Sequence, residues 1–189
     1  MRVIAGQYRS RPLRSLRGLD VRPTSDRLRE TLFNVLTAGR PEALAGSVWL
    51  DLFAGTGAVG IEALSRGARA VYFVESSPRA AAVIRENLRA LGISEGFEIH
   101  EREVQRALRL LDSKEVGPDY VFLDPPYRRR QAYDETLRLL SQSRLLRPAS
   151  TVIAEHEKKF DPGGRFGALQ RYRLLQQGDA ALSFYQLSA

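Results

Sequence analysis

Short apolar runs alternate with amphipathic segments along most of the chain. The runs are nearly continuous in apolar side chains, as in strands buried on both faces. Between them, apolar side chains recur every three or four residues, as in helices packed on a sheet. The predicted strands are residues 48–53, 70–75, 97–100, 120–124 and 151–155, and the predicted helices are residues 59–66, 78–91, 103–111 and 133–141. This alternation predicts an α/β fold with a doubly wound, mostly parallel sheet.

The C-terminal end of the chain follows a different pattern. Residues 172–176 and 181–187 are strand-like and flank the turn signal Gly178-Asp179. A signal of this kind predicts a β-hairpin. We therefore expect an antiparallel strand pair to end the sheet and to bring it to seven strands.

The N-terminal end carries a second, smaller pattern. Residues 2–5 and 12–16 are short strand-like segments around a glycine break, which predicts a small β-hairpin arm. A helix that begins near Ser25 and ends before the next glycine would link this arm to the sheet. We therefore divide the chain into an arm, residues 1–22, and a body, residues 23–189, which includes the linking helix.

The amino-acid composition excludes several kinds of functional site. The chain has 189 residues and no cysteine, which rules out a disulfide framework, a thiolate metal site and a cysteine nucleophile. Its two histidines, His100 and His156, are too few for a histidine-rich metal site, so we interpret both as structural and expect no metal. Glu155 and Glu157 alternate with His156 along a predicted strand, and we assign these two carboxylates no role.

The chain lacks the sequence features of membrane insertion or export. No apolar run approaches the roughly 20 residues that span a bilayer, and the N-terminus has no apolar signal-peptide core. We expect a cytoplasmic, monomeric protein that does not enter a membrane.

Positive charge is concentrated at the N-terminus. The formal net charge is +7, and residues 1–19 contain no acidic residue but five arginines: Arg2, Arg9, Arg11, Arg14 and Arg17. Such a distribution predicts a polyanionic partner, and the planar fork of arginine suits phosphates and stacked bases. We take the first four arginines as candidate nucleic-acid ligands; the alternative interpretation is a solvated basic tail.

A glycine-rich turn is the first motif that suggests chemistry. The heptapeptide DLFAGTG, residues 51–57, lies where a buried strand should end and a helix begin. Glycines there let the backbone approach a ligand, and the helix N-terminus offers free N–H groups. The next strand ends in Glu75, whose carboxylate could hold the hydroxyls of a ribose. These features predict an adenosine-containing cofactor, S-adenosylmethionine or NAD, and Gly60 keeps NAD open because it completes the Gly-x-Gly-x-x-Gly spacing.

The tetrapeptide DPPY, residues 124–127, is the strongest signal in the chain. It follows an apolar strand and therefore lies at the same sheet edge as the glycine turn. The Asp124 carboxylate and the Pro125 carbonyl can accept hydrogen bonds from an exocyclic base amine. Pro126, which has no N–H, keeps the loop rigid, and the Tyr127 ring can stack on the base. The motif favours S-adenosylmethionine, whose activated methyl group needs positioning and electrostatics rather than a metal.

Taken together, these motifs resemble those of S-adenosylmethionine-dependent methyltransferases that modify exocyclic amines. Three further segments extend the resemblance: RVIAGQYR at residues 2–9, RPTSDRLRETLFN at residues 22–34 and GDAALSFY at residues 178–185. With them, nearly the whole chain is similar to the bacterial 16S ribosomal RNA guanine-N2 methyltransferase D family. The resemblance implies the S-adenosylmethionine methyltransferase fold and methyl transfer to guanine N2 in small-subunit ribosomal RNA, within an assembled or assembling subunit.

The resemblance also implies roles for individual residues. Four residues of the glycine-rich motif would surround the methionine part of the cofactor: Asp51, Phe53, Gly55 and Gly57. Glu75 would hold the ribose. Glu103 stands where relatives commonly carry Asp or Asn beside the adenine ring, and its longer side chain departs from that pattern. Thr24 and Arg27 would close over the site, although a helix cap and a solvated arginine are alternatives for them.

Three arginines follow the DPPY motif: Arg128, Arg129 and Arg130. They are placed to grip phosphates beside a base drawn out of its stack, unless the run is merely solvated. Two other hypotheses stay open. One is an adenine-N6 methyltransferase that acts on DNA or another RNA, since the DPPY motif alone is shared with such enzymes. The other is a nucleic-acid-binding module with a vestigial cofactor pocket, against which the intact DPPY loop argues.

Overall fold

The computed structural model describes residues 1–15, 25–126 and 128–188. Two predicted site residues, Thr24 and Tyr127, lie outside the described residues, as do Arg17 and the predicted boundary between arm and body. The first described range, residues 1–15, is called the N-terminal segment below.

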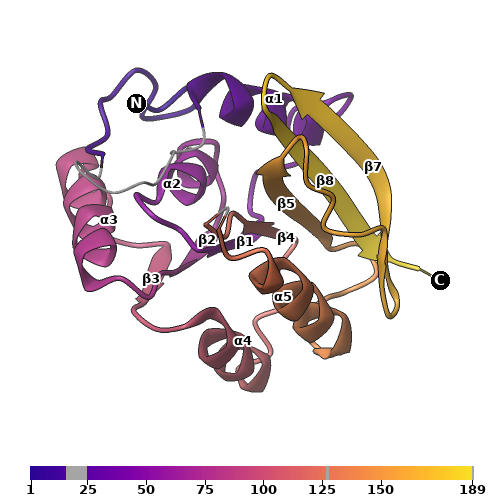
Figure 1. Ribbon diagram of the computed structural model, residues 1–189. Coiled ribbons are helices and arrows are strands. Elements are labelled where there is room, and N and C mark those ends of the chain that lie inside the picture. Colours follow the sequence, from indigo (N-terminus) through magenta and orange to yellow (C-terminus); the bar gives the residue numbers. More distant parts are fainter. Residues whose placement is uncertain (16–24, 127, 189) are drawn as a thin grey trace.

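A single sheet runs through the molecule (Figure 1), with strand order β3-β2-β1-β4-β5-β8-β7-β6. The strands are β1 Val48–Leu52, β2 Ala70–Val74, β3 Phe97–His100, β4 Tyr120–Leu123, β5 Thr151–Glu157, β6 Arg165–Phe166, β7 Leu169–Gln177 and β8 Ala180–Leu187. Strands β1 to β5 pair in parallel, and β8, β7 and β6 add to them antiparallel. The described residues form eight strands in this sheet, whereas seven were predicted, and the additional strand is the two-residue β6.

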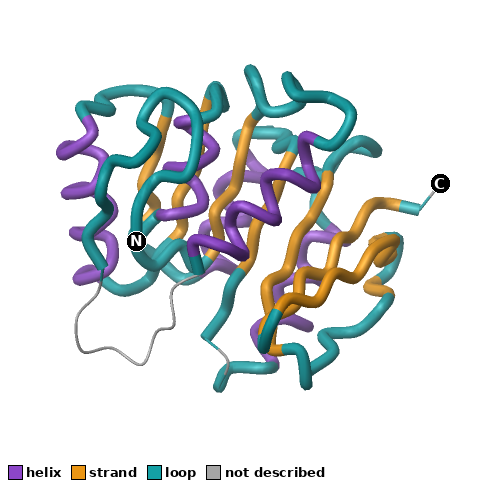
Figure 2. Tube along the Cα trace, turned by 90° about the horizontal axis from the view of Figure 1, so that it is seen from above, coloured by secondary structure: helices purple, strands orange, loops and turns teal. Residues whose placement is uncertain are grey.

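Five described helices cover the two faces of this sheet. They are α1 Asp26–Thr37, α2 Ala58–Ser65, α3 Pro78–Leu91, α4 Val104–Ser113 and α5 Gln131–Gln142. Helices α1 to α3 lie on one face, and α4 and α5 lie on the other (Figures 1 and 2). Trp49 and Leu50, neighbours on β1, belong to two different apolar clusters, one under α1 to α3 and one under α4 and α5. The predicted doubly wound arrangement is confirmed. No helix in the described ranges is long and apolar enough to cross a membrane.

Short polar and glycine signals set the ends of the helices. Helix α1 begins after Ser25, whose hydroxyl accepts the N–H of Leu28 at 3.1 Å. Helix α3 begins after Ser77, has Pro78 in its first turn, and ends before Gly92, whose φ of 74° is left-handed. The bounds predicted for this helix from the sequence are therefore confirmed at both ends.

Gly60 has a steric role inside α2, a helix that is buried along nearly its whole length. A Cβ atom at Gly60 would lie 2.3 Å from a ring carbon of Phe73 and 2.7 Å from a methyl group of Val71. The glycine is therefore required by the close approach of α2 to β2. It explains the third glycine of the spacing without any reference to NAD.

The strand order reverses at β1, and this reversal positions the site. From β1 the chain moves outward to β2 and β3, then returns to β4 on the other side of β1. In such sheets ligands bind at the carboxyl edge, where the loops of the two neighbouring strands diverge. The register pairs Leu52 of β1 with Leu123 of β4. The glycine turn and the Asp-Pro-Pro loop therefore start side by side, as predicted.

The N-terminal segment packs on α2 and α3 and forms less strand than predicted. Its two halves share one antiparallel bridge, between Arg2 and Pro12, in place of two strands. The N–H groups of Ile4 and of the next residue donate instead to the carboxylate of Glu62, at 2.7 and 3.0 Å. The hairpin prediction is therefore wrong in length, because a side chain of α2 takes the backbone donors that a longer ladder would need.

Glu62 is the centre of a buried charged cluster that joins this segment to α1 and α2. Its carboxylate accepts the Nε–H of Arg66 at 2.7 Å and lies 3.8 Å from the Nε of Arg29. The side chains of Glu62 and Arg29 have no exposed surface. Arg29 also donates to the carbonyl of Arg2. Because a buried charge without its partner is costly, this cluster ties the N-terminal segment firmly to the body.

We expect Glu62→Ala to destabilise the protein by about 3–5 kcal/mol, because it removes the fully buried one of the two carboxylates beside Arg29 and leaves the backbone N–H of Ile4 without its acceptor. Urea unfolding followed by circular dichroism measures this change. Asp134→Ala is the control, since it removes only the exposed ion pair with Arg138 on α5. Equal unfolding midpoints for the two variants would contradict the role given to Glu62.

Candidate active site

The glycine turn, residues 53–57, contains three left-handed residues. They are Phe53 with φ 59°, Gly55 with φ 55° and Gly57 with φ 75°. This conformation costs glycine little, but it strains a bulky residue such as Phe53, and strain of this kind gathers at functional sites. The residue after Phe53 donates its N–H to the carbonyl of Val74 at 3.0 Å, which fastens the turn to the end of β2.

Glu75 follows β2 and holds the turn from the other side. One of its carboxylate oxygens accepts the N–H of Gly55 at 2.8 Å, and the other accepts the N–H of Ser77 at 2.8 Å. The hydroxyl of Ser77 caps α3, so the cap does not depend on the Glu75 side chain alone. Each carboxylate oxygen can accept more than one hydrogen bond. Glu75 is partly exposed and retains capacity for the two hydroxyls of a ribose.

Asp51 lies at the end of β1 with 2% of its surface exposed. Its carboxylate accepts the N–H of Gly60 at 2.9 Å. Burial raises the pKa of Asp51 to about 8 against the lowering effect of the Gly60 hydrogen bond, and the negative charge of Glu75 raises it further. A cationic group bound nearby would reverse this effect, because opposite charges favour the ionised form. The site is thus suited to a positively charged ligand.

Asp124 follows β4 and is only partly exposed. Its backbone N–H donates to the carbonyl of Leu52 at 3.4 Å, so its loop begins beside the glycine turn. Burial raises the pKa of Asp124 well above its usual range, and the charges of Glu155 and Asp51 add to the rise. The carboxyl edge therefore brings Glu155 and Asp51 within electrostatic reach of Asp124.

Tyr133 of α5 fastens the Asp-Pro-Pro loop. Its buried hydroxyl donates to the carbonyl of Glu155 at 2.8 Å and lies 3.4 Å from the carbonyl of Pro125. A hydroxyl has one hydrogen to donate, so its stronger hydrogen bond is the shorter one, to the carbonyl of Glu155. The Pro125 carbonyl is therefore held in place while it keeps capacity for another donor, as its predicted role requires. Pro125 is buried and Pro126 is exposed.

Glu155 has no role in the sequence analysis, yet the structure brings it to this edge. It is 3% exposed on β5, one position beyond Ala154, which pairs with Leu123 directly before Asp124. The signal that could have found it is an acidic residue near the carboxyl end of a predicted strand, a position that Asp51 and Asp124 also occupy.

Two predicted cofactor ligands are placed less closely. Glu103 is exposed and stands at the start of α4, three residues after β3. The N–H of Glu75 donates to the carbonyl of His100 at 3.1 Å, so the ends of β2 and β3 lie together. Arg27 is exposed in the first turn of α1. A cofactor contact for either residue stays a prediction.

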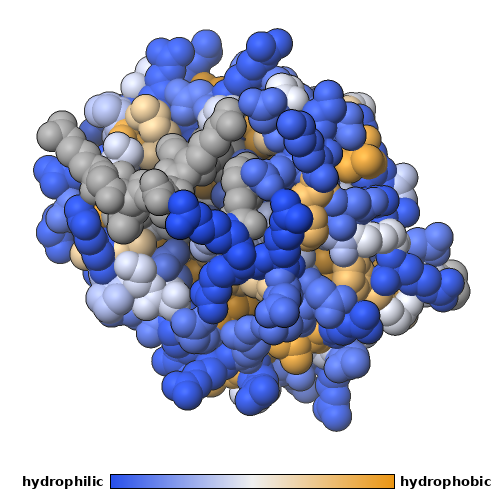
Figure 3. Space-filling model, in the orientation of Figure 1, coloured by the Kyte–Doolittle hydropathy of each residue, from blue (hydrophilic) through white to orange (hydrophobic). Residues whose placement is uncertain are grey.

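All seven predicted nucleic-acid ligands are exposed: Arg2, Arg9, Arg11, Arg14, Arg128, Arg129 and Arg130. The face of the molecule in Figure 3 is largely hydrophilic, with smaller apolar patches between polar side chains. Some of these arginines also have partners within the protein. Arg14 pairs with Glu86 at 2.7 Å, and Arg130 lies 3.7 Å from Glu157. Exposed ion pairs contribute little to stability, so a phosphate could replace the glutamate carboxylate in either pair.

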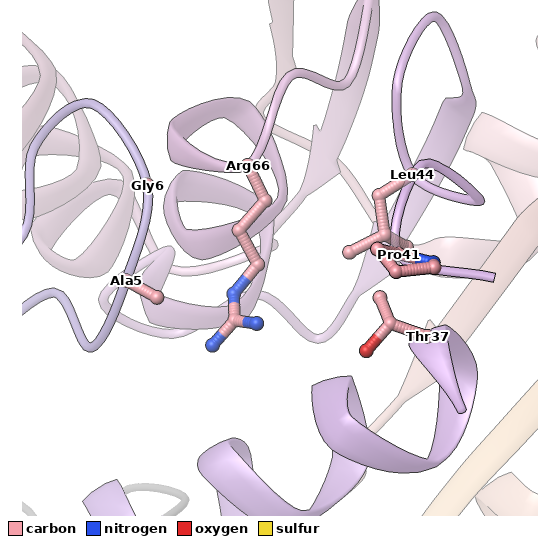
Figure 4. A pocket seen from close by; sticks show the side chains of 6 residues that line it. All are labelled: Ala5, Gly6, Thr37, Pro41, Leu44 and Arg66. Atoms are coloured by element: carbon pink, nitrogen blue, oxygen red, sulfur yellow. The ribbon is translucent and has the colours of Figure 1, made fainter. Parts of the chain in front are cut away.

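The pocket in Figure 4 is separate from the candidate site. It has a volume of about 350 Å³ and is lined by Ala5, Gly6, Thr37, Pro41, Leu44 and Arg66. Arg66 follows the C-terminal end of α2, whereas the glycine turn precedes the N-terminal end of the same helix. The pocket therefore lies at the end of α2 opposite the predicted cofactor turn.

The two histidines are buried and packed. In His156, Nε2 lies 2.9 Å from the hydroxyl of Ser183 and Nδ1 lies 2.9 Å from the carbonyl of Glu157. Burial lowers the pKa of both His156 and His100. These surroundings fit the structural role expected for both. Among the described residues, no three or more His, Cys, Asp or Glu side chains are grouped so that they could hold a metal ion.

The fold, with its glycine turn, is that of S-adenosylmethionine-dependent methyltransferases. A solved structure of an Escherichia coli protein superposes with a TM-score of 0.81 at 29% identity and covers 100% of this chain and 98% of the other. The S-adenosylmethionine-dependent methyltransferase of Agrobacterium tumefaciens shares the fold at a TM-score of 0.63 and 16% identity, covering 89% and 63% of the two chains.

The comparison of sequences then identifies the family. The family model described as Conserved hypothetical protein 95 matches residues 1–186. Ribosomal RNA small subunit methyltransferase D of Haemophilus influenzae is 39% identical over 160 residues, which cover 84% of this chain and 79% of the relative. The chain belongs to this ribosomal RNA small subunit methyltransferase D family. The predicted family and fold class are confirmed.

The raised pKa of Asp51 predicts how stability changes with pH. The folded protein holds this pKa near 8 against an ordinary value of 3.8, so folding takes up a proton between these values. The stabilising contribution is complete below about pH 4 and is lost as the pH rises through about 8. Asp51→Asn does not titrate, so its advantage over the parent should grow by up to about 1.4 kcal/mol per pH unit in this window and level off above it. Melting temperatures from pH 5 to 9 measure the difference, and parallel curves for the two proteins would refute it.

Proposed function

We propose that this protein transfers a methyl group from S-adenosylmethionine to the exocyclic N2 amine of a guanine in small-subunit ribosomal RNA. The observation that carries the proposal is the contact of Asp124 with the end of β1. Its backbone nitrogen lies 3.4 Å from the carbonyl oxygen of Leu52, so the Asp-Pro-Pro loop, which would bind the amine, begins beside the glycine turn, which would bind the cofactor.

The residues present fit S-adenosylmethionine. A strained glycine turn lets the backbone approach the methionine part, and Glu75 stands at the neighbouring strand end for the ribose. The buried carboxyl of Asp51 favours a positively charged ligand, and the cofactor carries a sulfonium and an ammonium group. When bound, the cofactor supplies a methyl group on a positively charged sulfur, which leaves as a neutral thioether.

Asp124 and Pro125 would prepare the amine for attack. The amine lone pair is delocalised into the base, and two acceptors on its hydrogens favour the tetrahedral nitrogen that can attack. In the transfer the amine nitrogen would bond to the methyl carbon as that carbon's bond to sulfur breaks, and the nitrogen would become cationic. It then loses a proton, for which the carboxylate of Asp124 is the nearest base proposed. Catalysis would depend on positioning and electrostatics.

The choice of guanine rests on family membership. Two acceptors at the loop bind an amine on guanine or adenine equally, so the loop chemistry does not separate N2-methylguanine from the N6-methyladenine of the alternative hypothesis. The name of the Haemophilus influenzae relative specifies small-subunit ribosomal RNA as its substrate. The resemblance stated in the sequence analysis adds the guanine amine.

The partner we propose is an assembled or assembling small ribosomal subunit, met in the cytoplasm by a monomer of this protein. Seven exposed arginines from the N-terminal segment and from residues 128–130 would bind phosphates. The N-terminal segment is small, so the particle would have to supply much of the shape that is recognised. We also propose the division into residues 1–22, which would help to bind these phosphates, and residues 23–189, which would carry the methyltransferase site.

One assay tests the reaction and its substrate. The protein is incubated with radiolabelled S-adenosylmethionine and, separately, with naked ribosomal RNA, assembled small subunits and duplex DNA. Mass spectrometry then identifies the methylated nucleoside. We expect N2-methylguanosine from the assembled subunits, whereas N6-methyladenosine from DNA would refute the proposal in favour of its alternative. No transfer to any substrate would favour a binding module.

Asp124→Ala tests the catalytic assignment. We expect turnover to fall by about 10²–10⁴, because the amine loses an acceptor and its proton acceptor. S-adenosylhomocysteine should bind within about threefold of the parent, a difference smaller than one net hydrogen bond. Asp134→Asn, an exposed carboxylate of α5, is the control and should retain full turnover. Turnover of Asp124→Ala within a few-fold of the parent would show that the assigned role is wrong.

A further inference from the structure

Asn87 of α3 joins the N-terminal segment to the glycine turn. The residue is 1% exposed, and all the polar groups of its amide are used. Its Oδ1 accepts the backbone N–H of Arg14 at 2.7 Å, and its Nδ2 donates to the carbonyl of Arg14 at 3.2 Å. The same Nδ2 donates to the carbonyl of Thr56 at 3.0 Å. One side chain therefore bonds to two parts of the chain. One is the N-terminal segment, whose proposed ligand is RNA, and the other is the glycine turn, whose proposed ligand is S-adenosylmethionine.

These contacts require an amide in one orientation. Two carbonyls need the two N–H groups of the amide, and the Arg14 N–H needs its oxygen. An aspartate, or a flipped amide, would place oxygen against two carbonyls. The bridge is therefore specific to asparagine at position 87.

The glycine turn depends on contacts of this kind. Phe53 and Gly57 are left-handed, and strained backbone persists only where its surroundings hold it. Besides Asn87, α3 places Ile84 against the turn, where a Cβ atom at Gly57 would lie 3.2 Å from an Ile84 methyl group. The hydroxyl of Thr56 also lies 3.8 Å from the sulfur of Met1. Both α3 and the N-terminal segment thus hold the turn.

Backbone hydrogen bonds fasten the N-terminal segment to α2. The N–H of Tyr8 donates to the hydroxyl of Ser65 at 3.0 Å, and the N–H of Gln7 donates to the Ser65 carbonyl at 2.7 Å. Its outer side carries the exposed arginines proposed to bind phosphates. A ligand that holds Arg14, one of these arginines, acts on backbone that is directly bonded to Asn87.

We propose that Asn87 is a positioning residue that makes cofactor affinity depend on how the basic N-terminal segment is held. The inference relies on the proposed function for the identity of the cofactor and the RNA. RNA that binds the segment holds the backbone of Arg14, which fixes the Asn87 amide and, through it, the carbonyl of Thr56 in the cofactor turn. Because such coupling is reciprocal, bound cofactor also favours RNA binding by the same factor.

The first test measures the binding of S-adenosylhomocysteine to the full-length protein by titration calorimetry. Asn87→Ala should weaken it by about tenfold, or about 1.4 kcal/mol, which is the size of the hydrogen bonds lost. The KM for S-adenosylmethionine should rise by a similar factor, while kcat at saturating cofactor stays within about threefold because the amine-binding loop is unchanged. Glu86→Gln is the matched control on the same helix. It removes only the exposed pair with the Arg14 side chain and should bind within about twofold of the parent.

A second pair of variants tests the bridge from its other end. Arg14→Pro removes the N–H that Asn87 accepts, whereas Arg14→Ala removes the side chain and keeps this N–H. Among the described contacts, the Arg14 backbone is connected to the glycine turn by the Asn87 amide, which donates to the carbonyls of both Arg14 and Thr56. We expect Arg14→Pro to weaken S-adenosylhomocysteine binding by about threefold or more, the effect of one lost hydrogen bond. Arg14→Ala should bind it as the parent does.

The outcomes separate this inference from the proposed function. Binding of S-adenosylhomocysteine by Asn87→Ala within about twofold of the parent would overturn the inference, as would equal weakening by both Arg14 variants. If Asn87→Ala does not fold, the Arg14 pair decides. A parent protein that binds no S-adenosylhomocysteine would refute the proposed cofactor itself.

Discussion

The parallel pairing of β1 with β4 is the constraint on which the site depends. These strands are distant in the sequence, and their register places Leu52 opposite Leu123. Since the strand order reverses here, the two following loops diverge and open an edge to solvent. A slip of the register by one residue would turn Asp51 from one face of the sheet to the other and separate the paired loops. The hydrophobic cores on both faces therefore fix the geometry at the edge, because they allow only one register.

Burial of acidic groups at this edge has a cost that a cofactor could offset. Asp51 and Glu155 are almost fully buried, and Asp124 is partly so. The pKa values of Asp51 and Asp124 are raised, which means that burial at this edge disfavours their ionised forms. Groups that are unfavourable for stability but gathered at one edge are typical of functional sites. A sulfonium near these carboxylates would favour their charged forms, so cofactor binding and readiness to accept a proton would arise together.

Most of the fold was predictable, because its signals are local. Strands of the parallel sheet are continuous apolar runs, and the ends of α3 carry the Ser-Pro and Gly signals of a helix. The predicted hairpin at the N-terminus was too long, since the donors of Ile4 and Ala5 go to Glu62, 58 and 57 residues away. Contacts at such separation have no local signal. Glu155 was missed for a related reason, because alternation along one strand says nothing about the neighbouring strand that places it beside Asp124.

The same long-range contacts change the meaning of the basic N-terminus. Its composition suggests an appended arm, whereas Glu62, Ser65 and Asn87 bond its backbone to α2 and α3. The Asp-Pro-Pro loop, in its proposed role, would offer two acceptors that do not tell guanine from adenine, so discrimination would have to come from contacts outside that loop. A basic segment bonded to the body can hold RNA in one position relative to the cofactor turn, which a freely moving tail cannot do. Under the proposed function, attachment of the segment by these hydrogen bonds would provide what the local chemistry of the loop lacks, a fixed frame in which one base reaches the methyl group.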